Sequence, residues 1–136
     1  MPESVNNGPA QPHASILLVE DSPPQALKLK LGLENQGCRV DWASTGLAGL
    51  NLAQQKSFDL VVLDIELPDI NGFEVCRRLK ADPQLAQIPV VMLTTLDQAE
   101  NVLDGLEAGA VDYIPKDAFA EAVLLETIKQ MQQGNS

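Results

Sequence analysis

The chain has 136 residues, of which 45% are hydrophobic and 21% charged, and its formal net charge is −10. A chain of this length forms one domain and can bury a core without disulfides or metal staples. The acidic balance argues against direct binding of nucleic acid or of an anionic membrane surface, because both require basic patches.

Residues 1–14 contain Pro, Asn and Gly and no apolar stretch, so we expect a disordered leader that is neither a signal peptide nor a membrane anchor. Strand-like apolar runs and helix-length segments then alternate along the chain. The expected strands cover residues 15–20, 39–43, 59–64, 88–94 and 110–114. The expected helices cover residues 23–36, 45–55, 72–81, 98–108 and 119–132, and residues 133–136 form a short tail.

Five strands that each precede a helix indicate a parallel sheet covered on both faces, which is an α/β fold of three layers. Residues 16–19 and 89–93 are apolar throughout, as expected for parallel strands buried on both sides. No internal repeat or linker divides residues 15–132, so we expect a single domain there. The two cysteines, Cys38 and Cys76, lack metal-ligand spacing and indicate reduced thiols in a cytoplasmic protein.

The first expected helix is locally ambiguous, because residues 27–33 alternate as an edge strand does. We assign a helix since Ser22 can cap it and two prolines follow that suit a first helical turn. On a helix the apolar residues form two stripes, one of Ala26, Leu29 and Leu33 and one of Leu27 and Leu31. The first must pack on the sheet. The second is either buried in a well-covered helix or exposed beside Lys28, where a partner helix could dock.

Polar residues gather where the expected strands end, and ligands of open parallel sheets bind outside that edge. These residues are Glu20 and Asp21, Asp64, Thr94, and Lys116. One such residue is usually a structural cap, but their joint arrival indicates a site. Three neighbouring carboxylates repel each other unless a cation intervenes, and Mg²⁺ suits carboxylate, water and phosphate oxygens. Asp64 could then attack a phosphoryl group to form an acyl phosphate, with Lys116 and Thr94 on phosphoryl oxygens.

Four segments carry a resemblance to the receiver domain of two-component response regulators, and the similarity covers about residues 15–132. The segments are residues 17–21, 64–72, 89–94 and 109–116. The resemblance implies a flavodoxin-like, doubly wound (βα)5 fold with strand order 2-1-3-4-5. It implies that Asp64 accepts a phosphoryl group from a phosphohistidine of a sensor histidine kinase or a histidine phosphotransfer protein.

The resemblance also implies a role for each site residue. The implied ligands of Mg²⁺ (or Mn²⁺) are Glu20, Asp21, Asp64 and the backbone carbonyl of Glu66. The implied phosphoryl ligands are Thr94 and Lys116, and the implied switch residues are Thr94 and Tyr113, whose ring turns inward when Thr94 moves.

Such a protein is a phosphoacceptor switch that catalyses only its own Mg²⁺-dependent phosphorylation and dephosphorylation. It would signal by contact with a downstream protein, by homodimerisation or by onward phosphotransfer, and not by binding nucleic acid or membrane. The acidic region of residues 98–131 would be its output face. The chain would be either a stand-alone receiver or part of a longer regulator or hybrid kinase.

Three positions differ from the family's usual pattern or vary within it. Asp117 stands where a proline usually follows the lysine through a cis bond, so a trans bond is expected to be accessible here. Thr95 occupies a position where a small residue is common, and Glu66 one that is associated with phosphate lifetime. We expect Thr95 and Glu66 to hinder the hydrolytic water and to prolong the phosphorylated state.

Three alternative functions fit the sequence less well. A flavodoxin-like FMN-binding protein needs hydroxyls and free amides in its first loop, but residues 20–24 supply two acids and two prolines. A small Mg²⁺-dependent phosphatase could use Glu66 as its second acid, but 136 residues leave no cap domain to enclose a substrate. A receiver-like scaffold that is never phosphorylated would not need the complete set of acids, hydroxyl and lysine.

Overall fold

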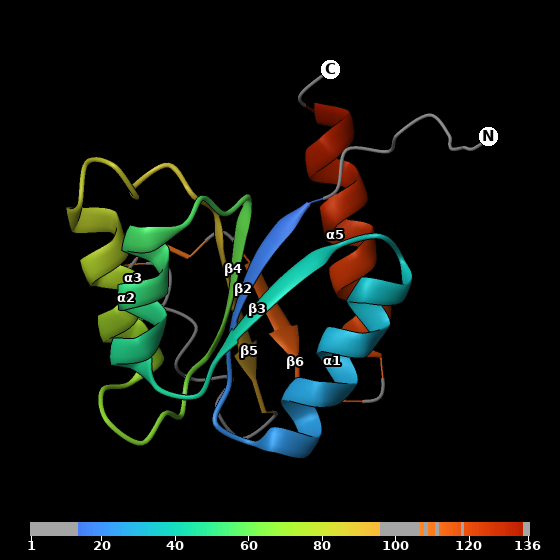
Figure 1. Ribbon diagram of the computed structural model, residues 1–136, viewed down its shortest axis with the longest axis horizontal. Coiled ribbons are helices and arrows are strands. Elements are labelled where there is room, and N and C mark those ends of the chain that lie inside the picture. The colour runs from blue at the N-terminus through green and yellow to red at the C-terminus, as the bar shows by residue number, and fades with distance from the viewer. Residues whose placement is uncertain (1–13, 96–106, 108, 111, 118, 135–136) are drawn as a thin grey trace.

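The computed structural model describes residues 14–95, 107, 109–110, 112–117 and 119–134 (Figure 1). The expected leader, apart from its last residue, and the expected helix at residues 98–108, apart from residue 107, therefore lie outside the described residues. So do Glu100 and Asp104, two acids of the expected output face at residues 98–131.

Five parallel strands form one sheet, in the order β3-β2-β4-β5-β6. They are β2 (Ser15–Val19), β3 (Arg39–Ala43), β4 (Leu60–Asp64), β5 (Val90–Thr94) and β6 (Asp112–Pro115). The described helices are α1 (Pro23–Asn35), α2 (Gly46–Gln55), α3 (Gly72–Ala81) and α5 (Ala120–Gly134). Counted along the chain, the strand order is 2-1-3-4-5, which confirms the predicted topology. Helix α5 extends two residues beyond the expected end at residue 132.

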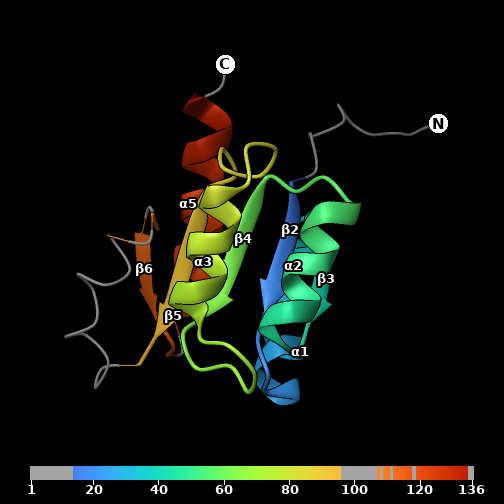
Figure 2. The ribbon, with the colours of Figure 1, turned by 90° about the vertical axis from the view of Figure 1, so that its left-hand side faces the viewer.

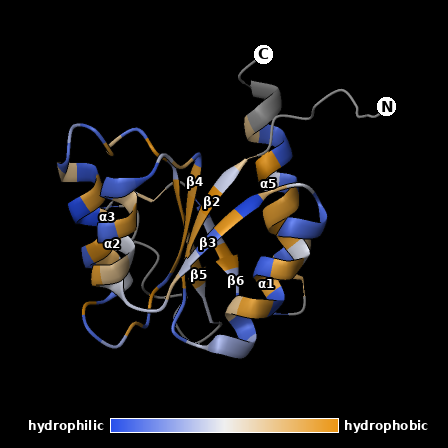
Figure 3. Cartoon of the chain, viewed as in Figure 1, coloured by the Kyte–Doolittle hydropathy of each residue, from blue (hydrophilic) through white to orange (hydrophobic). Residues whose placement is uncertain are grey.

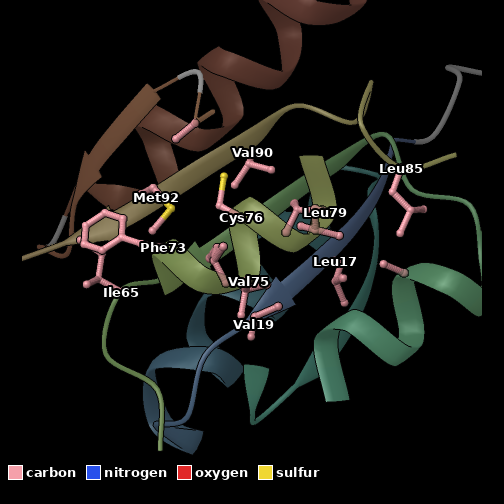
Figure 4. Close-up of a cluster of buried hydrophobic side chains, with 14 of the residues drawn as sticks. Leu17, Val19, Ile65, Phe73, Val75, Cys76, Leu79, Leu85, Val90 and Met92 are labelled. Atoms are coloured by element: carbon pink, nitrogen blue, oxygen red, sulfur yellow. The ribbon is translucent and has the colours of Figure 1, made fainter. Parts of the chain in front are cut away.

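The helices cover both faces of the sheet, α2 and α3 on one side and α1 and α5 on the other (Figure 1). The predicted three layers are therefore confirmed. Consecutive strand residues face opposite layers, so Leu17 and Val19 join the cluster under α2 and α3, while Ile16 and Leu18 join the cluster under α1 and α5. In the first cluster, Phe73 and Cys76 of α3 pack with strand side chains such as Met92 (Figure 4).

Helix α1 settles the ambiguity of its sequence. Its three buried residues are Ala26, Leu29 and Leu33, as the first stripe predicts. Leu27 and Leu31 are 53% and 51% exposed, so the second stripe faces solvent. The apolar and polar sides of the helices are visible in Figure 3, where the inner strands between them are mostly hydrophobic and β3 at the sheet edge is mixed. No helix of the described residues is both long and apolar enough to span a bilayer.

Side-chain caps begin two of the helices, but not the one for which a cap was expected. Thr45 Oγ1 accepts a hydrogen bond from Ala48 N–H at the start of α2, and Asn71 Oδ1 accepts one from Glu74 N–H at the start of α3. Ser22 lies at the N-cap position of α1 but its side chain makes no capping hydrogen bond. Its backbone N–H instead donates to Glu20 Oε2 at 3.0 Å, so Ser22 orients a carboxylate of the candidate site.

Candidate functional site

The polar residues predicted from the strand ends do meet at one edge of the sheet. Asp64 and Thr94 are the last residues of β4 and β5, Glu20 follows β2, and Lys116 follows β6. The arrowheads of these four strands lie at the same edge in Figure 2. Glu20, Asp64 and Thr94 are the buried polar residues among those described, with 0%, 2% and 8% exposure. Buried polar groups at a strand end need a partner that compensates for lost hydration, and Lys116 supplies one.

The ammonium group of Lys116 lies between the two buried carboxylates. Its Nζ donates a hydrogen bond to Asp64 Oδ2 at 2.8 Å and lies 3.3 Å from Glu20 Oε1. Burial alone would lower the pKa of Lys116, but the hydrogen bond and negative charge of Asp64 outweigh it and raise that pKa above its usual value. Lys116 is therefore a permanent cation at the site.

Glu20 is the electrostatically least satisfied group of the site. Burial raises its pKa from 4.5 to about 7, and the neighbouring charge of Asp64 acts in the same direction. Its Oε1 atom is buried and has no hydrogen-bond partner among the described residues, since the nearby ammonium is not aligned for one. A cation that occupied this edge would meet an oxygen with an unused lone pair.

Three carboxylates fit a hard metal ion. Glu20, Asp21 and Asp64 each offer one oxygen, and these oxygens lie within 4.8 Å of one another. Asp21 is exposed while the other two are buried, so the cluster is open to water on one side. An open cluster of oxygen ligands beside a free edge is the environment that Mg²⁺ prefers. Glu66, the fourth expected ligand, follows Asp64 closely, and its N–H donates to Asp64 Oδ1 at 3.1 Å.

The loop between β4 and α3 closes tightly over Asp64, and a glycine makes this possible. Gly72 N–H donates to the Ile65 carbonyl at 2.8 Å. A Cβ atom on Gly72 would collide with the backbone carbonyl oxygen of Asp64 and would lie 3.0 Å from the Cα atom of Ile65. Because these are backbone atoms, no side-chain rotation could relieve the collision. Gly72 therefore keeps the loop in contact with the strand end that carries Asp64.

Two residues that the sequence analysis did not single out also shape the site. The carboxylate of Asp69 accepts hydrogen bonds from Gly46 and Leu47 N–H at 2.9 and 2.8 Å, which ties the loop after Asp64 to the first turn of α2. Its slight burial raises the pKa, but these hydrogen bonds outweigh it and lower the pKa overall. The indole Nε1–H of Trp42 on β3 donates to the backbone carbonyl of Glu20 at 2.7 Å.

The expected switch residues, Thr94 and Tyr113, lie on the neighbouring strands β5 and β6. Thr94 Oγ1 donates to the Thr95 carbonyl at 3.0 Å. Tyr113 pairs with Met92 in the sheet and is half-buried against the cluster under α2 and α3. The peptide bond before Asp117, which stands in place of the usual proline, is trans, like every peptide bond among the described residues. The carboxylate of Asp117 accepts a hydrogen bond from Phe119 N–H.

A cavity of about 200 Å³ adjoins the site on the side of α1 and α5. Glu20 belongs to both the cavity wall and the carboxylate cluster, Lys116 lines the cavity and pairs with that cluster, and α1 contributes Gln25 and Lys28. The solvent-facing side of α1 is thus continuous with the reactive edge of the sheet.

Comparison with known proteins points in the same direction. The family model of the response regulator receiver domain matches residues 16–129. Protein PilH of Pseudomonas aeruginosa is 40% identical over 121 residues, which are 89% of this chain and 99% of PilH. The signal receiver domain of a signal transduction histidine kinase from Syntrophus aciditrophicus has a similar structure, with a TM-score of 0.81 and 36% identity, and 89% of this chain and 91% of that one are covered.

A third relative carries a metal. This relative is the receiver domain of sensor histidine kinase PA1611 from Pseudomonas aeruginosa PAO1, whose structure has a magnesium ion coordinated in the active site cleft. It is 26% identical to this chain with a TM-score of 0.79, and the match covers 87% of this chain and 96% of that one. Other relatives are longer. The chain spans about half the length of two transcriptional regulators that it matches at 40% and 45% identity.

Proposed function

The chain belongs to the response regulator receiver domain family, and on that premise we propose that it is a phosphorylation-dependent signalling switch with Asp64 as its phosphoacceptor. The donor is a phosphohistidine of a sensor histidine kinase or of a histidine phosphotransfer protein. The observation that carries the proposal is the position of Asp64: a buried carboxylate 2.8 Å from the Lys116 ammonium, with two further carboxylates beside it. We propose that the receiver domain comprises residues 15–132. Its proposed location is the cytoplasm.

Transfer forms a bond between an Asp64 carboxylate oxygen and phosphorus while the bond from phosphorus to the histidine nitrogen breaks. The Lys116 ammonium, which pairs with Asp64 before transfer, is close enough to pair with a phosphoryl oxygen afterwards. Glu20, Asp21, Asp64 and the Glu66 carbonyl are the proposed ligands of Mg²⁺ (or Mn²⁺). When bound, the ion would neutralise charge that develops on the phosphoryl oxygens.

The signal is proposed to leave the site through Thr94. Its hydroxyl now donates to the Thr95 carbonyl, and a phosphoryl oxygen on Asp64 offers a charged acceptor that makes a stronger hydrogen bond. When the hydroxyl turns to that oxygen, the space beside Thr94 changes and Tyr113 moves inward. The altered surface then binds a downstream protein or a second copy of the chain, and the acidic composition disfavours direct contact with nucleic acid.

The donor is proposed to approach over α1. Leu27 and Leu31 are half exposed there, and the cavity lined by Lys28 leads from this helix to Glu20 and Lys116. An amphipathic helix that carries the phosphohistidine can cover the two leucines while its imidazole faces the site.

The lifetime of the phosphorylated state is proposed to depend on Thr95 and Glu66, which stand next to Thr94 and two residues after Asp64. Both would restrict the water that hydrolyses the acyl phosphate. Thr95→Ala should therefore increase the rate of dephosphorylation, as followed by loss of the phosphorylated mass with time. An unchanged rate would show that Thr95 takes no part.

The proposal is tested by intact mass measurement after incubation with acetyl phosphate and Mg²⁺. We expect a gain of one phosphoryl group that disappears without Mg²⁺ and in Asp64→Asn. Asp41→Asn, on β3 and away from the carboxylate cluster, is the matched control and should still gain the phosphoryl group. Absence of any gain in the parent protein, with acetyl phosphate or a phosphorylated kinase, would contradict the proposal.

A further inference from the structure

We propose that Trp42 is a positioning residue for Glu20, and that its indole N–H sets how tightly the site binds a divalent cation. This inference rests on the proposed function, because it concerns the metal that the site would hold.

Glu20 lies one residue beyond the end of β2, and residues of β3 bind both its backbone N–H and its backbone carbonyl. Its N–H donates to the Ala43 carbonyl at 3.0 Å, which extends the ladder between the two strands by one bond. Its carbonyl accepts the indole N–H of Trp42 at 2.7 Å, in place of a bond from a further strand residue. Both polar backbone groups of a metal-ligand candidate are therefore fixed by β3.

The rest of the turn has few means of its own to hold Glu20 in place. Ser22 uses its N–H to bind the Glu20 carboxylate, and its side chain makes no capping bond. Pro23 and Pro24 have no N–H groups to offer. Glu20 Oε1 has no hydrogen bond among the described residues, and Oε2 accepts one from Ser22 of the same turn, so where this turn places the carboxylate depends on the backbone that Trp42 anchors.

The register of the sheet explains why Trp42 reaches this carbonyl. Trp42 pairs with Leu18 across β2 and β3, and both lie on the side of the sheet that α1 covers. Trp42 is half-buried against the same cluster as Leu18, so its ring is held along the sheet face just before Glu20. An indole reaches further than any other side chain with a single fixed N–H donor, and here that donor meets a carbonyl at the strand end.

Trp42→Phe removes the N–H and keeps an aromatic ring, while Val40→Ala is the matched control. Val40 lies two residues earlier on β3, faces the same cluster and is 6% exposed, so its truncation loosens packing without touching Glu20. Binding of Mn²⁺ is measured by electron paramagnetic resonance of the free ion, which needs no tryptophan signal, and stability by urea unfolding. We expect Trp42→Phe to weaken Mn²⁺ binding about three- to tenfold, which is the effect of one hydrogen bond. Val40→Ala should change the Mn²⁺ affinity by less than about twofold, although it lowers the free energy of unfolding as much as Trp42→Phe does or more.

Two further readouts separate positioning from general stability. With acetyl phosphate, Trp42→Phe should raise the Mg²⁺ concentration for half-maximal phosphorylation without lowering the rate at saturating Mg²⁺. In the parent protein, the one indole N–H resonance, from the single tryptophan, should shift as Mg²⁺ is added.

Equal metal affinity in Trp42→Phe and the parent, or equal weakening by Val40→Ala, would overturn the inference while leaving the proposed function intact. A parent protein that binds neither Mn²⁺ nor Mg²⁺ would overturn the inference and the metal-dependent function together.

Discussion

Lys116→Met tests whether one ammonium group compensates two buried carboxylates. In the parent protein, Nζ lies 2.8 Å from Asp64 and 3.3 Å from Glu20, whose side chains are 2% and 0% exposed. Breaking a buried ion pair by removing one partner costs about 3–5 kcal/mol, because an uncompensated charge remains. The loss has an upper bound here, since Glu20 can take up a proton: its pKa is already about 7, and Lys116 is one of the groups that lower it.

The cost should therefore depend on pH. A carboxyl whose pKa is raised in the folded protein stabilises the fold only while it is protonated, so the penalty of losing Lys116 is largest when Glu20 is ionised. We expect Lys116→Met to lower the free energy of unfolding by about 3 kcal/mol near pH 8 and by about 1 kcal/mol near pH 5. Urea unfolding at both pH values, without divalent ions, measures this difference.

Lys56→Met is the control. Lys56 pairs with Asp41 at only 2.6 Å, but their side chains are 57% and 29% exposed, so water screens the pair. Its loss should cost less than about 1 kcal/mol at either pH. An equal penalty for Lys116→Met at the two pH values, or a penalty no larger than that of Lys56→Met, would refute the electrostatic reasoning.

Three other predictions follow from the site and its surroundings. Gly72→Ala should lower the free energy of urea unfolding by about 1–3 kcal/mol and slow phosphorylation of Asp64, because the new methyl group meets backbone atoms. In the control Gly49→Ala the methyl group meets the side chain of Val19, so the losses of stability and of phosphorylation rate should both be smaller. Without metal, the free energy of unfolding should fall as the pH rises from about 5 to about 7, because the folded protein holds the Glu20 proton more tightly than the unfolded chain does. The Mg²⁺ affinity, measured by calorimetry, should rise over the same pH range. If neither quantity changed with pH, the raised pKa of Glu20 would be contradicted. Leu31→Asp should slow phosphotransfer from a phosphorylated kinase but leave the rate with acetyl phosphate unchanged, and equal slowing with both donors would argue against docking on α1.

The fold was predictable because local and long-range signals agree in this chain. Apolar runs such as residues 60–63 are buried on both faces, as their lack of alternation predicts. The site was predictable for a related reason: in a parallel sheet, residues at the carboxyl ends of strands converge wherever they lie in the sequence. Glu20, Asp64 and Lys116 therefore meet as expected.

What the sequence did not reveal depends on register and on hydrogen bonds whose partners only the fold brings together. The contact of Trp42 with the Glu20 carbonyl requires that Trp42 stand opposite Leu18, and no local pattern fixes that alignment. Ser22 was expected to cap α1, but its side chain makes no capping hydrogen bond, and its N–H donates to the Glu20 carboxylate. The role of Asp69 had one signal in the sequence, because an acid in a loop can bind the N–H groups at a helix N-terminus. Only the fold shows that the helix it reaches is α2.

The most direct test of the central claim is to locate the acyl phosphate. After phosphorylation with Mg²⁺, borohydride reduces an aspartyl phosphate to the alcohol, homoserine, and tandem mass spectrometry of the peptides then identifies the modified residue. We predict homoserine at Asp64 and no reduced side chain at the other acids of the site, Glu20, Asp21 or Glu66. Reduction at another residue, or phosphorylation that resists borohydride and leaves Asp64 unmodified, would contradict the assignment of Asp64 as phosphoacceptor.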